Sequence, residues 1–402
     1  MLDMVANVDD LRRLARRRVP RVFQQYVEAG SYDELTLRAN RRDLDALAFR
    51  QRTVLDVSGR KLSARLFGTE ATLPLALAPP GLIGAVHVNG EVCAARAAEK
   101  FGVPFCLSTM SICSIEDIAA ATTRPFWFQI YLMKDRGFTQ SLLERAKAAG
   151  CSALVLTLDL HVEGRRNADV HNGLNIPPRL TLANMLDILS SPSWAFSMLR
   201  SKHFTFGNLE GHAKSGDIAS LTEWVKDQFD PHFTARDIAW VRSLWPGTLI
   251  AKGVLDPEDA RVAVSNGADA VVVSNHGGRQ LDGAPSSVAA FRKIKEAVGN
   301  DAEVWFDSGI RSGLDVLKAL ALGADGCLIG RAFVYGLGAA GEKGVTKALE
   351  IIRDELDTAM ALTGITDVSA VTSDVLLPAP ENSTNIAEGR VAPSKGHERI
   401  AS

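Results

Sequence analysis

Short, continuous apolar runs alternate along the chain with amphipathic segments of helical period. Four segments repeat one plan, in which a helix and a glycine turn precede a β-branched run with a polar end: "AAEKFGVPFCLS", "RAKAAGCSALVLTLD", "AVSNGADAVVVSNHG" and "LKALALGADGCLIGR". Such runs between amphipathic helices indicate parallel strands that are covered on both faces. Adding "LPLALAPPG", "RPFWFQIY", "GTLIAKG" and "AEVWFDSGI" gives eight strands in series. The pattern predicts an α/β fold, a (β/α)8 TIM barrel, with a doubly wound sheet as the alternative.

The predicted elements also outline the domain organisation. An N-terminal helical segment precedes the barrel, and one domain over residues 1–372 contains the barrel at about 73–340. The connection between "TLDL" and "LIAKG" is far longer than the roughly 2–6 residues usual for a βα loop, which predicts an insertion in the fourth βα loop at about 177–215. The stretch 373–402 is rich in Pro, Ser and charge, and we expect a disordered tail there.

Composition narrows the functional classes. The 402 residues are 46% hydrophobic and 23% charged with a formal net charge of −2, which is typical of a globular protein and does not favour a nucleic-acid partner. Five cysteines without paired spacing predict free thiols and no metal site. With neither a secretory-type apolar segment nor a run long enough to span a bilayer, we expect a cytoplasmic protein.

The predicted strands end in polar or turn-forming residues. In chain order these ends are Pro79 to Gly81, Ser108, Gln129 with Tyr131, Thr157 with Asp159, Lys252, Ser274 with His276, Asp307, and Gly330 with Arg331. Barrel enzymes build their sites from the carboxyl ends of the strands, so these groups should line one cup. The motifs "DSGIRSGLDV" and "GRAF" place arginines in glycine turns at helix starts. That chemistry suits a phosphate, and tight turns with solvated arginines are the alternative.

Several motifs resemble the family of FMN-dependent α-hydroxy-acid dehydrogenases and oxidases. They are "SNHGGRQLDG", "DSGIRSGLDVLKALALGAD", "LIGRAFVYGL", "LSTMSICSIED", "WFQIYLMKDR" and "VLDPEDARVAVSNGADAVVVSNHGG". The resemblance extends from about Val19 to about Thr372. Within the family the chain looks most like the bacterial L-lactate dehydrogenases, and next most like the (S)-mandelate dehydrogenases. The resemblance implies FMN as the cofactor.

The resemblance implies a role for each matching residue. His276 resembles the base, Tyr131 an active-site tyrosine, and Asp159 the carboxylate that holds the imidazole. Arg279 and Arg166 resemble the pair that binds the substrate carboxylate, with Tyr26 and Tyr131 beside the substrate. The implied FMN contacts are Pro79, Pro80, Gly81, Ser108, Gln129, Thr157, Lys252, Ser274, Asp307, Ser308, Gly309, Ile310, Arg311, Gly330 and Arg331.

Physical chemistry supports these roles independently. Histidine titrates near neutral pH and suits proton transfer, and an arginine fork binds a carboxylate through two parallel hydrogen bonds. A lysine beside the flavin N1–O2 edge, the position that Lys252 matches, stabilises negative charge there.

Three departures from the family pattern affect these roles. Asn167 stands where many members carry Glu, which puts the support of Arg166 in question. The motif around Tyr26 reads "FQQYVEAGSYDE" in place of Asp-Tyr with paired glycines. Gly81 stands where the oxidase branch tends to carry Ala, which favours a dehydrogenase.

The resulting hypothesis is FMN-dependent oxidation of an L-2-hydroxy acid, foremost L-lactate to pyruvate, with electrons passed to a membrane quinone or another respiratory acceptor. The alternatives are a dehydrogenase for (S)-mandelate or another 2-hydroxy acid, a peroxide-forming oxidase, a non-catalytic flavin-binding barrel, and a phosphosugar isomerase. The insertion segment "LTLANMLDILSSPSWAFSMLRSK" combines apolar residues, tryptophan and flanking basic residues, which suits peripheral contact with the inner face of the cell membrane. The resemblance also implies a homotetramer, and the alternative is that the insertion forms a lid or a contact between its subunits.

Overall fold

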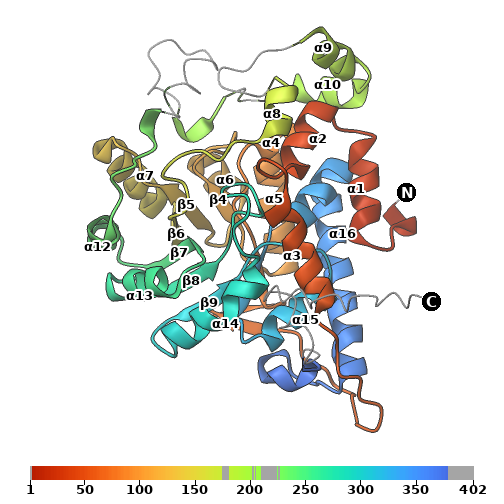
Figure 1. The fold of residues 1–402 in the computed structure, drawn as a ribbon. Coiled ribbons are helices and arrows are strands. Elements are labelled where there is room, and N and C mark those ends of the chain that lie inside the picture. The colour runs from red at the N-terminus through yellow and green to blue at the C-terminus, as the bar shows by residue number, and fades with distance from the viewer. Residues whose placement is uncertain are drawn as a thin grey trace, which may run out of the picture.

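Eight parallel strands form a barrel at the centre of the molecule (Figure 1). The computed structural model describes residues 2–173, 181–201, 203, 205–209, 224 and 227–378. The barrel strands are β3 (Leu75–Leu77), β4 (Cys106–Ser108), β5 (Trp127–Tyr131), β6 (Ala153–Thr157), β7 (Thr248–Val254), β8 (Ala270–Val273), β9 (Glu303–Phe306) and β10 (Gly326–Ile329). They pair in the order β3-β10-β9-β8-β7-β6-β5-β4, and a parallel bridge between Leu77 and Phe105 closes the ring between β3 and β4. The predicted TIM barrel is confirmed.

Helices follow the strands and cover the outside of the barrel (Figure 1). They are α4 (Ile83–Val86), α5 (Gly90–Phe101), α6 (Ile115–Ala121), α7 (Arg136–Ala148), α12 (Ala235–Leu244), α13 (Pro257–Ser265), α14 (Ser287–Val298), α15 (Gly313–Ala321) and α16 (Arg331–Thr363). Local chemistry sets their starts. Ser114 forms a capping box with Asp117 at α6, and Asp256 caps α13, whose first turn holds Pro257. Both helix starts are therefore set by residues next to them in the sequence.

The predicted N-terminal helical segment consists of α1 (Val8–Arg16), α2 (Arg21–Glu28) and α3 (Leu35–Ala46). Helix α1 packs along α16 and buries Leu11 completely (Figure 1). Helix α3 begins beside the turn after β8, where Asp282 Oδ1 accepts a hydrogen bond from the Thr36 amide at 2.9 Å. The segment therefore reaches the end of the barrel where the strands terminate.

A hairpin that the sequence did not predict covers the amino ends of the strands. It consists of β1 (Ala64–Leu66) and β2 (Thr69–Ala71), paired antiparallel. Its turn places Phe67 at φ 47° and Gly68 at φ 78°. The Phe67 ring stacks on Trp305 with ring centroids 5.2 Å apart and contacts the edge of Trp127. These aromatic contacts seal the barrel end opposite the strand carboxyl ends.

The fourth βα loop contains α8 (Asn167–His171), α9 (Leu182–Leu189) and α10 (Pro192–Met198). Helices α9 and α10 belong to the predicted insertion and stand above α2 at the top of Figure 1. The rest of the insertion lies partly outside the described residues. No helix in the described part of the chain is long and apolar enough to cross a bilayer.

The end of the domain lies further along the chain than the sequence predicted. Within the expected tail, Ser373–Val375 forms a 3-10 turn with Val375 buried, and Leu376 bridges Phe49. Apolar Val375 and Leu376 supply this packing, which the polar composition of the segment concealed. Residues 379–402 lie outside the described residues, so the disorder expected there is untested.

Candidate active site

His276 lies just after β8 and faces a carboxylate from the loop after β6. Its Nδ1 is 3.1 Å from Asp159 Oδ1 and 3.2 Å from Oδ2. The imidazole is 22% exposed and the Asp159 side chain 13%, so the ring remains accessible while the carboxylate behind it is largely covered. Burial opposes the charged form of Asp159, but the charge and hydrogen bond of His276 hold the pKa of this carboxyl below its usual range. Asp159 therefore orients the ring through Nδ1 and leaves Nε2 for proton transfer.

Arg279 lies three residues beyond His276 and contacts the end of α2. Its Nη1 donates to the backbone carbonyls of Tyr26 at 2.6 Å and Ala29 at 3.0 Å. The guanidinium also lies 4.7 Å from the centroid of the Tyr26 ring. Burial, followed by repulsion from Arg166, lowers the pKa of Arg279. Two neighbouring, partly buried cations favour an anion between them, as a substrate carboxylate would provide.

Arg166 is held by two carboxylates from its own loop. Its Nε donates to Asp169 Oδ2 and its Nη2 to Glu163 Oε1, both at 2.5 Å. Although burial lowers it, the pKa of Arg166 is raised overall by Tyr26, Asp169 and Glu163. The support that Asn167 put in question is therefore supplied by Asp169 and Glu163, while Asn167 Nδ2 donates to the Tyr32 carbonyl at 3.4 Å.

Tyr131 ends β5 and is 8% exposed. Its ring packs edge-on against Phe229, with ring centroids 5.8 Å apart. Burial raises the pKa of the Tyr131 hydroxyl above its usual range, and the charge of Asp159 adds to this. The hydroxyl therefore keeps its proton at neutral pH and can donate a hydrogen bond.

A row of polar side chains crosses the carboxyl ends of β4, β5 and β6. Ser108 Oγ donates to Gln129 Oε1, and Gln129 Nε2 donates to Thr157 Oγ1, each at 3.0 Å. Strand register explains the first of these bonds, because Ser108 pairs with Gln129 across β4 and β5, whereas Thr157 pairs with Tyr131 and is reached by the longer Gln129 side chain. Beyond β3, Pro79 to Gly81 lead to Leu82, whose amide donates to the Met110 carbonyl at 2.9 Å.

A buried triad continues the row at β7, β8 and β9. Lys252 Nζ lies 3.2 Å from Ser274 Oγ and 3.3 Å from Asp307 Oδ2, and Ser274 Oγ donates to Asp307 Oδ2 at 2.6 Å. Lys252 is only 4% exposed. A buried ammonium group needs such partners. The Lys252 ammonium places one positive charge among the carboxyl ends of the barrel strands.

The turns after β9 and β10 hold two partly buried arginines, Arg311 and Arg331. Gly309, at φ 106°, follows Ser308 in the first turn, and Gly330 precedes α16 in the second. Arg331 donates to the carbonyls of Val27, Ala29 and Gly277 at 2.8 to 3.0 Å. Burial, followed by repulsion from Arg311 and Arg279, lowers the pKa of Arg331 to about 9. A bound anion would relieve this repulsion, which supports a phosphate at these turns.

One side chain to which the sequence assigned no role, Gln280, joins the loop of Asp159 to the turn of His276. Gln280 Nε2 donates to the Asp159 carbonyl at 2.7 Å, and Gln280 Oε1 accepts from the Gly164 amide at 3.2 Å. Gln280 thereby fixes the Asp159 loop to the His276 turn. Its place in the "SNHGGRQ" motif was a signal that could have revealed it.

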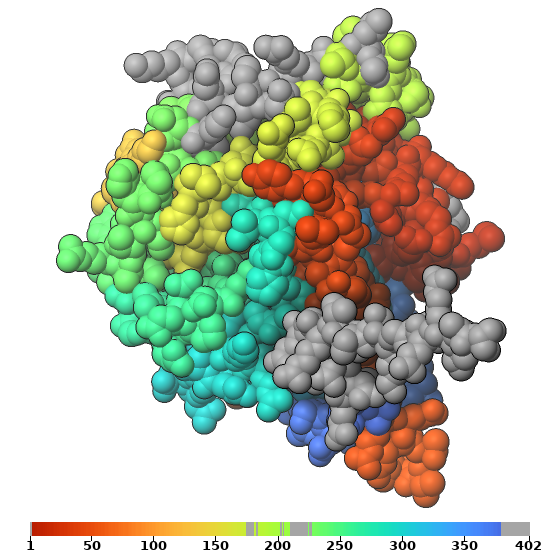
Figure 2. Space-filling model, in the orientation of Figure 1, coloured from red at the N-terminus to blue at the C-terminus, as the bar shows by residue number. Residues whose placement is uncertain are grey.

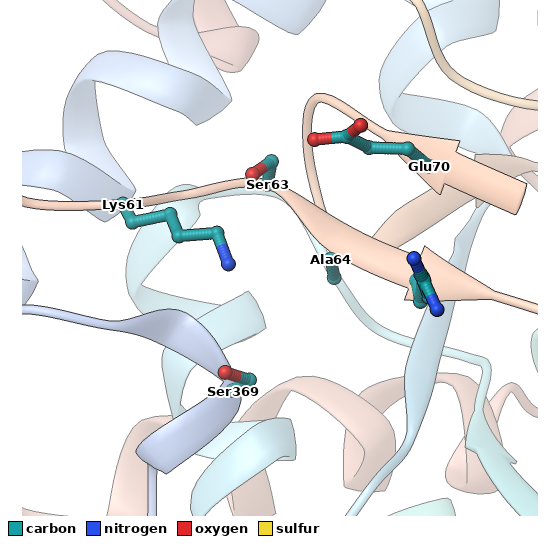
Figure 3. Close-up of a pocket in the computed structure, with 6 residues that line it drawn as sticks. Lys61, Ser63, Ala64, Glu70 and Ser369 are labelled. Atoms are coloured by element: carbon teal, nitrogen blue, oxygen red, sulfur yellow. The ribbon is translucent and has the colours of Figure 1, made fainter.

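A hollow of about 440 Å³ lies at the other end of the barrel, beside β1 and β2 (Figure 3). Figure 3 shows Lys61 and Ser369 on facing segments. The lining residues are Lys61, Ser63, Ala64, Arg65, Glu70 and Ser369. None of them is buried, so the charged groups here are solvated, and the candidate chemistry lies at the opposite end.

Comparison with known proteins identifies the family to which this site belongs. The FMN-dependent dehydrogenase family matches residues 15–378. The chain belongs to this family. It is therefore an oxidoreductase with FMN as its cofactor.

Named relatives cover nearly the whole chain. An L-lactate dehydrogenase of Pectobacterium atrosepticum is 47% identical over 370 residues, 92% of this chain and 96% of the relative. An L-lactate dehydrogenase of Acinetobacter baumannii is 45% identical over 94% of this chain and 98% of its own length. Among solved structures, the monotopic membrane protein (S)-mandelate dehydrogenase is 37% identical, with a TM-score of 0.89 over 93% of this chain and 99% of its own.

The described residues fit FMN. The strand ends supply donors for a flavin ring at Gln129 and Lys252, and the arginine-rich turns supply cations for a phosphate. A Cβ added to Gly330 would meet only Ala78 Cβ, at 3.9 Å, so the backbone at the start of α16 can be approached closely. The flavin ring and the phosphate of FMN therefore both have suitable partners at the carboxyl end of the barrel.

Proposed function

We propose that this enzyme oxidises an L-2-hydroxy acid, foremost L-lactate, to the 2-oxo acid and passes the electrons to an acceptor other than oxygen. The observation that carries the proposal is the His276–Asp159 pair, which lies beside the partly buried Arg279 three residues further along the chain, so that a base stands next to a carboxylate-binding fork. L-Lactate is favoured because the relatives of that name are 45–47% identical to this chain, whereas the mandelate dehydrogenase and oxidase structures are 36–39% identical.

Each side chain performs a separate part of the reaction. Arg279 and Arg166 bind the substrate carboxylate and orient the α-carbon, while Tyr26 and Tyr131 contact the substrate. His276 accepts a proton at Nε2, and Asp159 stabilises the imidazolium that forms. The conversion of a hydroxy acid to an oxo acid releases two electrons and two protons, and bound FMN supplies the electron acceptor.

Residues along the strand ends would hold FMN. The isoalloxazine would contact Pro79, Pro80, Gly81, Ser108, Gln129, Thr157, Lys252 and Ser274. The ribityl phosphate would contact the turns after β9 and β10, through Asp307, Ser308, Gly309, Ile310, Arg311, Gly330 and Arg331. The helix start and the guanidinium groups provide positive potential for the phosphate.

Lys252→Met is expected to slow reduction of the bound FMN by substrate by about 10²-fold or more, because a preorganised positive charge beside the flavin is lost. Rapid mixing with L-lactate without oxygen measures this rate. The change also leaves Asp307 buried without its cation, which destabilises the fold.

The double variant Lys252→Met/Asp307→Asn separates these two effects. It removes the unpaired charge and should recover thermal stability, while FMN reduction stays slow. Fast reduction in the double variant would show that Lys252 serves stability alone.

Gly81 supports an acceptor other than oxygen. A Cβ at this position would lie 3.0 Å from the Met110 carbonyl oxygen and 3.1 Å from Met110 Cβ, so an alanine, which the oxidase branch tends to carry here, would require this segment to shift. We expect fast dye reduction and slow peroxide formation with L-lactate, and lower rates with glycolate and (S)-mandelate. Steady-state rates with each acid, with dye and with oxygen, test both parts. Oxygen consumption equal to dye reduction would favour the oxidase alternative.

The insertion carries an exposed apolar surface that suits a membrane. Four side chains on α9, on α10 and directly after α10 are each 61% exposed or more: Leu186, Leu189, Phe196 and Leu199. Figure 2 shows these helices at the end of the molecule, beyond α2. The related mandelate dehydrogenase is described as a monotopic membrane protein. We therefore infer that the enzyme attaches peripherally to the cytoplasmic face of the membrane, where a quinone is accessible. We also propose that the enzyme is a homotetramer, as the family resemblance implies.

Replacing residues 182–201 with a Gly-Ser linker, which leaves the buried Asn208 and Leu209 in place, is expected to release the enzyme from membranes and preserve dye-linked activity. A smaller change, Leu189→Ser/Phe196→Ser/Leu199→Ser, retains the hydrogen bond from Trp194 Nε1 to the Ala85 carbonyl and should have the same effect. Val54→Ser, at an exposed position outside the insertion, is the matched control. Cosedimentation with anionic liposomes measures binding. Wild-type protein that stays in the supernatant would assign the helices to a lid or a subunit contact.

A further inference from the structure

The backbone at His276 adopts a conformation that the residue does not favour by itself. Its φ is 58°, in the left-handed region, where a residue other than glycine is held by its surroundings. Three successive amides in this turn donate to side-chain oxygens at 3.0 Å. The His276 amide donates to Ser274 Oγ and the Gly277 amide to Ser308 Oγ, while the Gly278 amide donates to Asn275 Oδ1 and also to the Asn275 carbonyl. These hydrogen bonds fix the path of the chain through the proposed base.

Asn275 is itself oriented by a distant residue. Asn40 Nδ2 donates to Asn275 Oδ1 at 2.8 Å, and Asn275 Nδ2 donates to Asn40 Oδ1 at 2.7 Å. The two amides form a reciprocal pair with both residues buried, at 2% and 4% exposure. Asn275 Nδ2 also donates to the Pro285 carbonyl at 3.1 Å. Only one orientation of the Asn275 amide satisfies all these partners, and it directs Oδ1 at the Gly278 amide.

Helix α3, which carries Asn40, is anchored to the neighbouring turn as well. Arg41 Nη1 donates to the Gly309 carbonyl and to Asp315 Oδ2, each at 2.6 Å. Asp315 Oδ2 accepts from the Arg311 amide at 2.8 Å. The helix thus has a fixed position against both the His276 turn and the proposed phosphate turn, and Asn40 meets Asn275 in one register.

We propose that Asn40 is a positioning residue for His276, acting through Asn275 and the Gly278 amide. The inference rests on the proposed function, because it assigns to Asn40 the geometry of the proposed base. Arg279 follows in the same turn, but the carbonyls of Tyr26 and Ala29 hold its guanidinium independently. Loss of the amide pair should therefore impair proton transfer more than substrate binding.

The near-isosteric variant Asn40→Asp tests the proposal without creating a cavity. It replaces the amide donor by a carboxylate oxygen that faces Asn275 Oδ1 and repels it. We expect kcat with L-lactate to fall on the order of 10- to 100-fold, with KM changed less than about threefold, because small displacements of a catalytic group are costly. In the same holoenzyme, the ¹³Cε1–¹Hε1 NMR signal of His276, assigned with His276→Ala, should shift.

The control variant is Asp43→Ala, on the same helix. It removes a hydrogen bond from Ser286 Oγ to Asp43 Oδ2 and leaves the amide pair intact. This variant should keep kcat and the His276 signal even if its melting temperature falls. If Asn40→Asp does not fold, Asn40→Ala, Asn275→Ala and the double variant form a cycle in which the two losses of kcat should not add.

The outcomes separate this inference from the proposed function. An unchanged kcat and an unchanged His276 signal in folded Asn40→Asp or Asn40→Ala would overturn the role of Asn40. Independent, additive losses in the cycle would also overturn it. A wild-type enzyme inactive on every 2-hydroxy acid would refute the proposed function, and the NMR shift would still report whether Asn40 positions His276.

Discussion

His276→Ala is expected to lower kcat with L-lactate by about 10²- to 10⁴-fold, the usual contribution of a positioned acid–base group. The protein should stay folded and yellow, because the proposed FMN site includes many other groups along the strand ends. We expect kcat to fall because Asp159 fixes the His276 ring through Nδ1, so that Nε2 is the atom proposed to take the substrate proton. Single-turnover reduction of the bound FMN under anaerobic conditions measures the effect.

His232→Ala is the matched control for this variant. His232 pairs with Asp230 at 3.2 Å, but its side chain is 87% exposed and lies outside the strand-end cup. It should retain wild-type rates. Substrate reduction of FMN at the wild-type rate in His276→Ala would remove His276 from its role as the base.

Arg279→Lys is expected to raise KM for L-lactate by about 10- to 100-fold, since a charge-assisted hydrogen bond contributes about 1.5–3 kcal/mol. The Arg279 Nη1 donates to two carbonyls at the end of α2, and the guanidinium stacks on Tyr26. The other N–H groups of the guanidinium are proposed to bind the substrate carboxylate. A lysine ammonium cannot make all these contacts with one geometry. Steady-state kinetics over a wide substrate range give KM and kcat separately.

Arg292→Lys is the control for the general effect of an arginine-to-lysine exchange. Arg292 lies on α14 with an 85% exposed side chain and pairs with Glu296. This change should alter neither constant. An unchanged KM in Arg279→Lys would mean that the substrate carboxylate binds elsewhere.

The barrel was predictable because its signals are local. Each strand is a short apolar run whose polar end falls at the carboxyl side, and helix starts such as Ser114 and Asp256 carry their own caps. The hairpin was not predictable on the same grounds. Its turn uses Phe67 at a positive φ, which phenylalanine disfavours, and the conformation depends on stacking against Trp305, far away in the sequence.

The candidate site was predictable only in part, for a related reason. Motifs and resemblance indicated His276 and Arg279, and the strand order brings them near Asp159. Asp169 and Glu163 hold Arg166 only because of the way one loop folds. The presence of Asn167 in place of the family's Glu therefore did not show whether Arg166 is held. Asn40 meets Asn275 only through the docking of α3, and no local pattern marks such a pair.

The central claim is that an L-2-hydroxy acid reduces FMN held at the carboxyl ends of this barrel. Anaerobic titration of the purified yellow protein with L-lactate tests it most directly. We predict loss of the visible flavin absorbance with one pyruvate formed per FMN, and recovery of the absorbance when a dye acceptor is added. A flavin spectrum unchanged by L-lactate, glycolate and (S)-mandelate would contradict the claim.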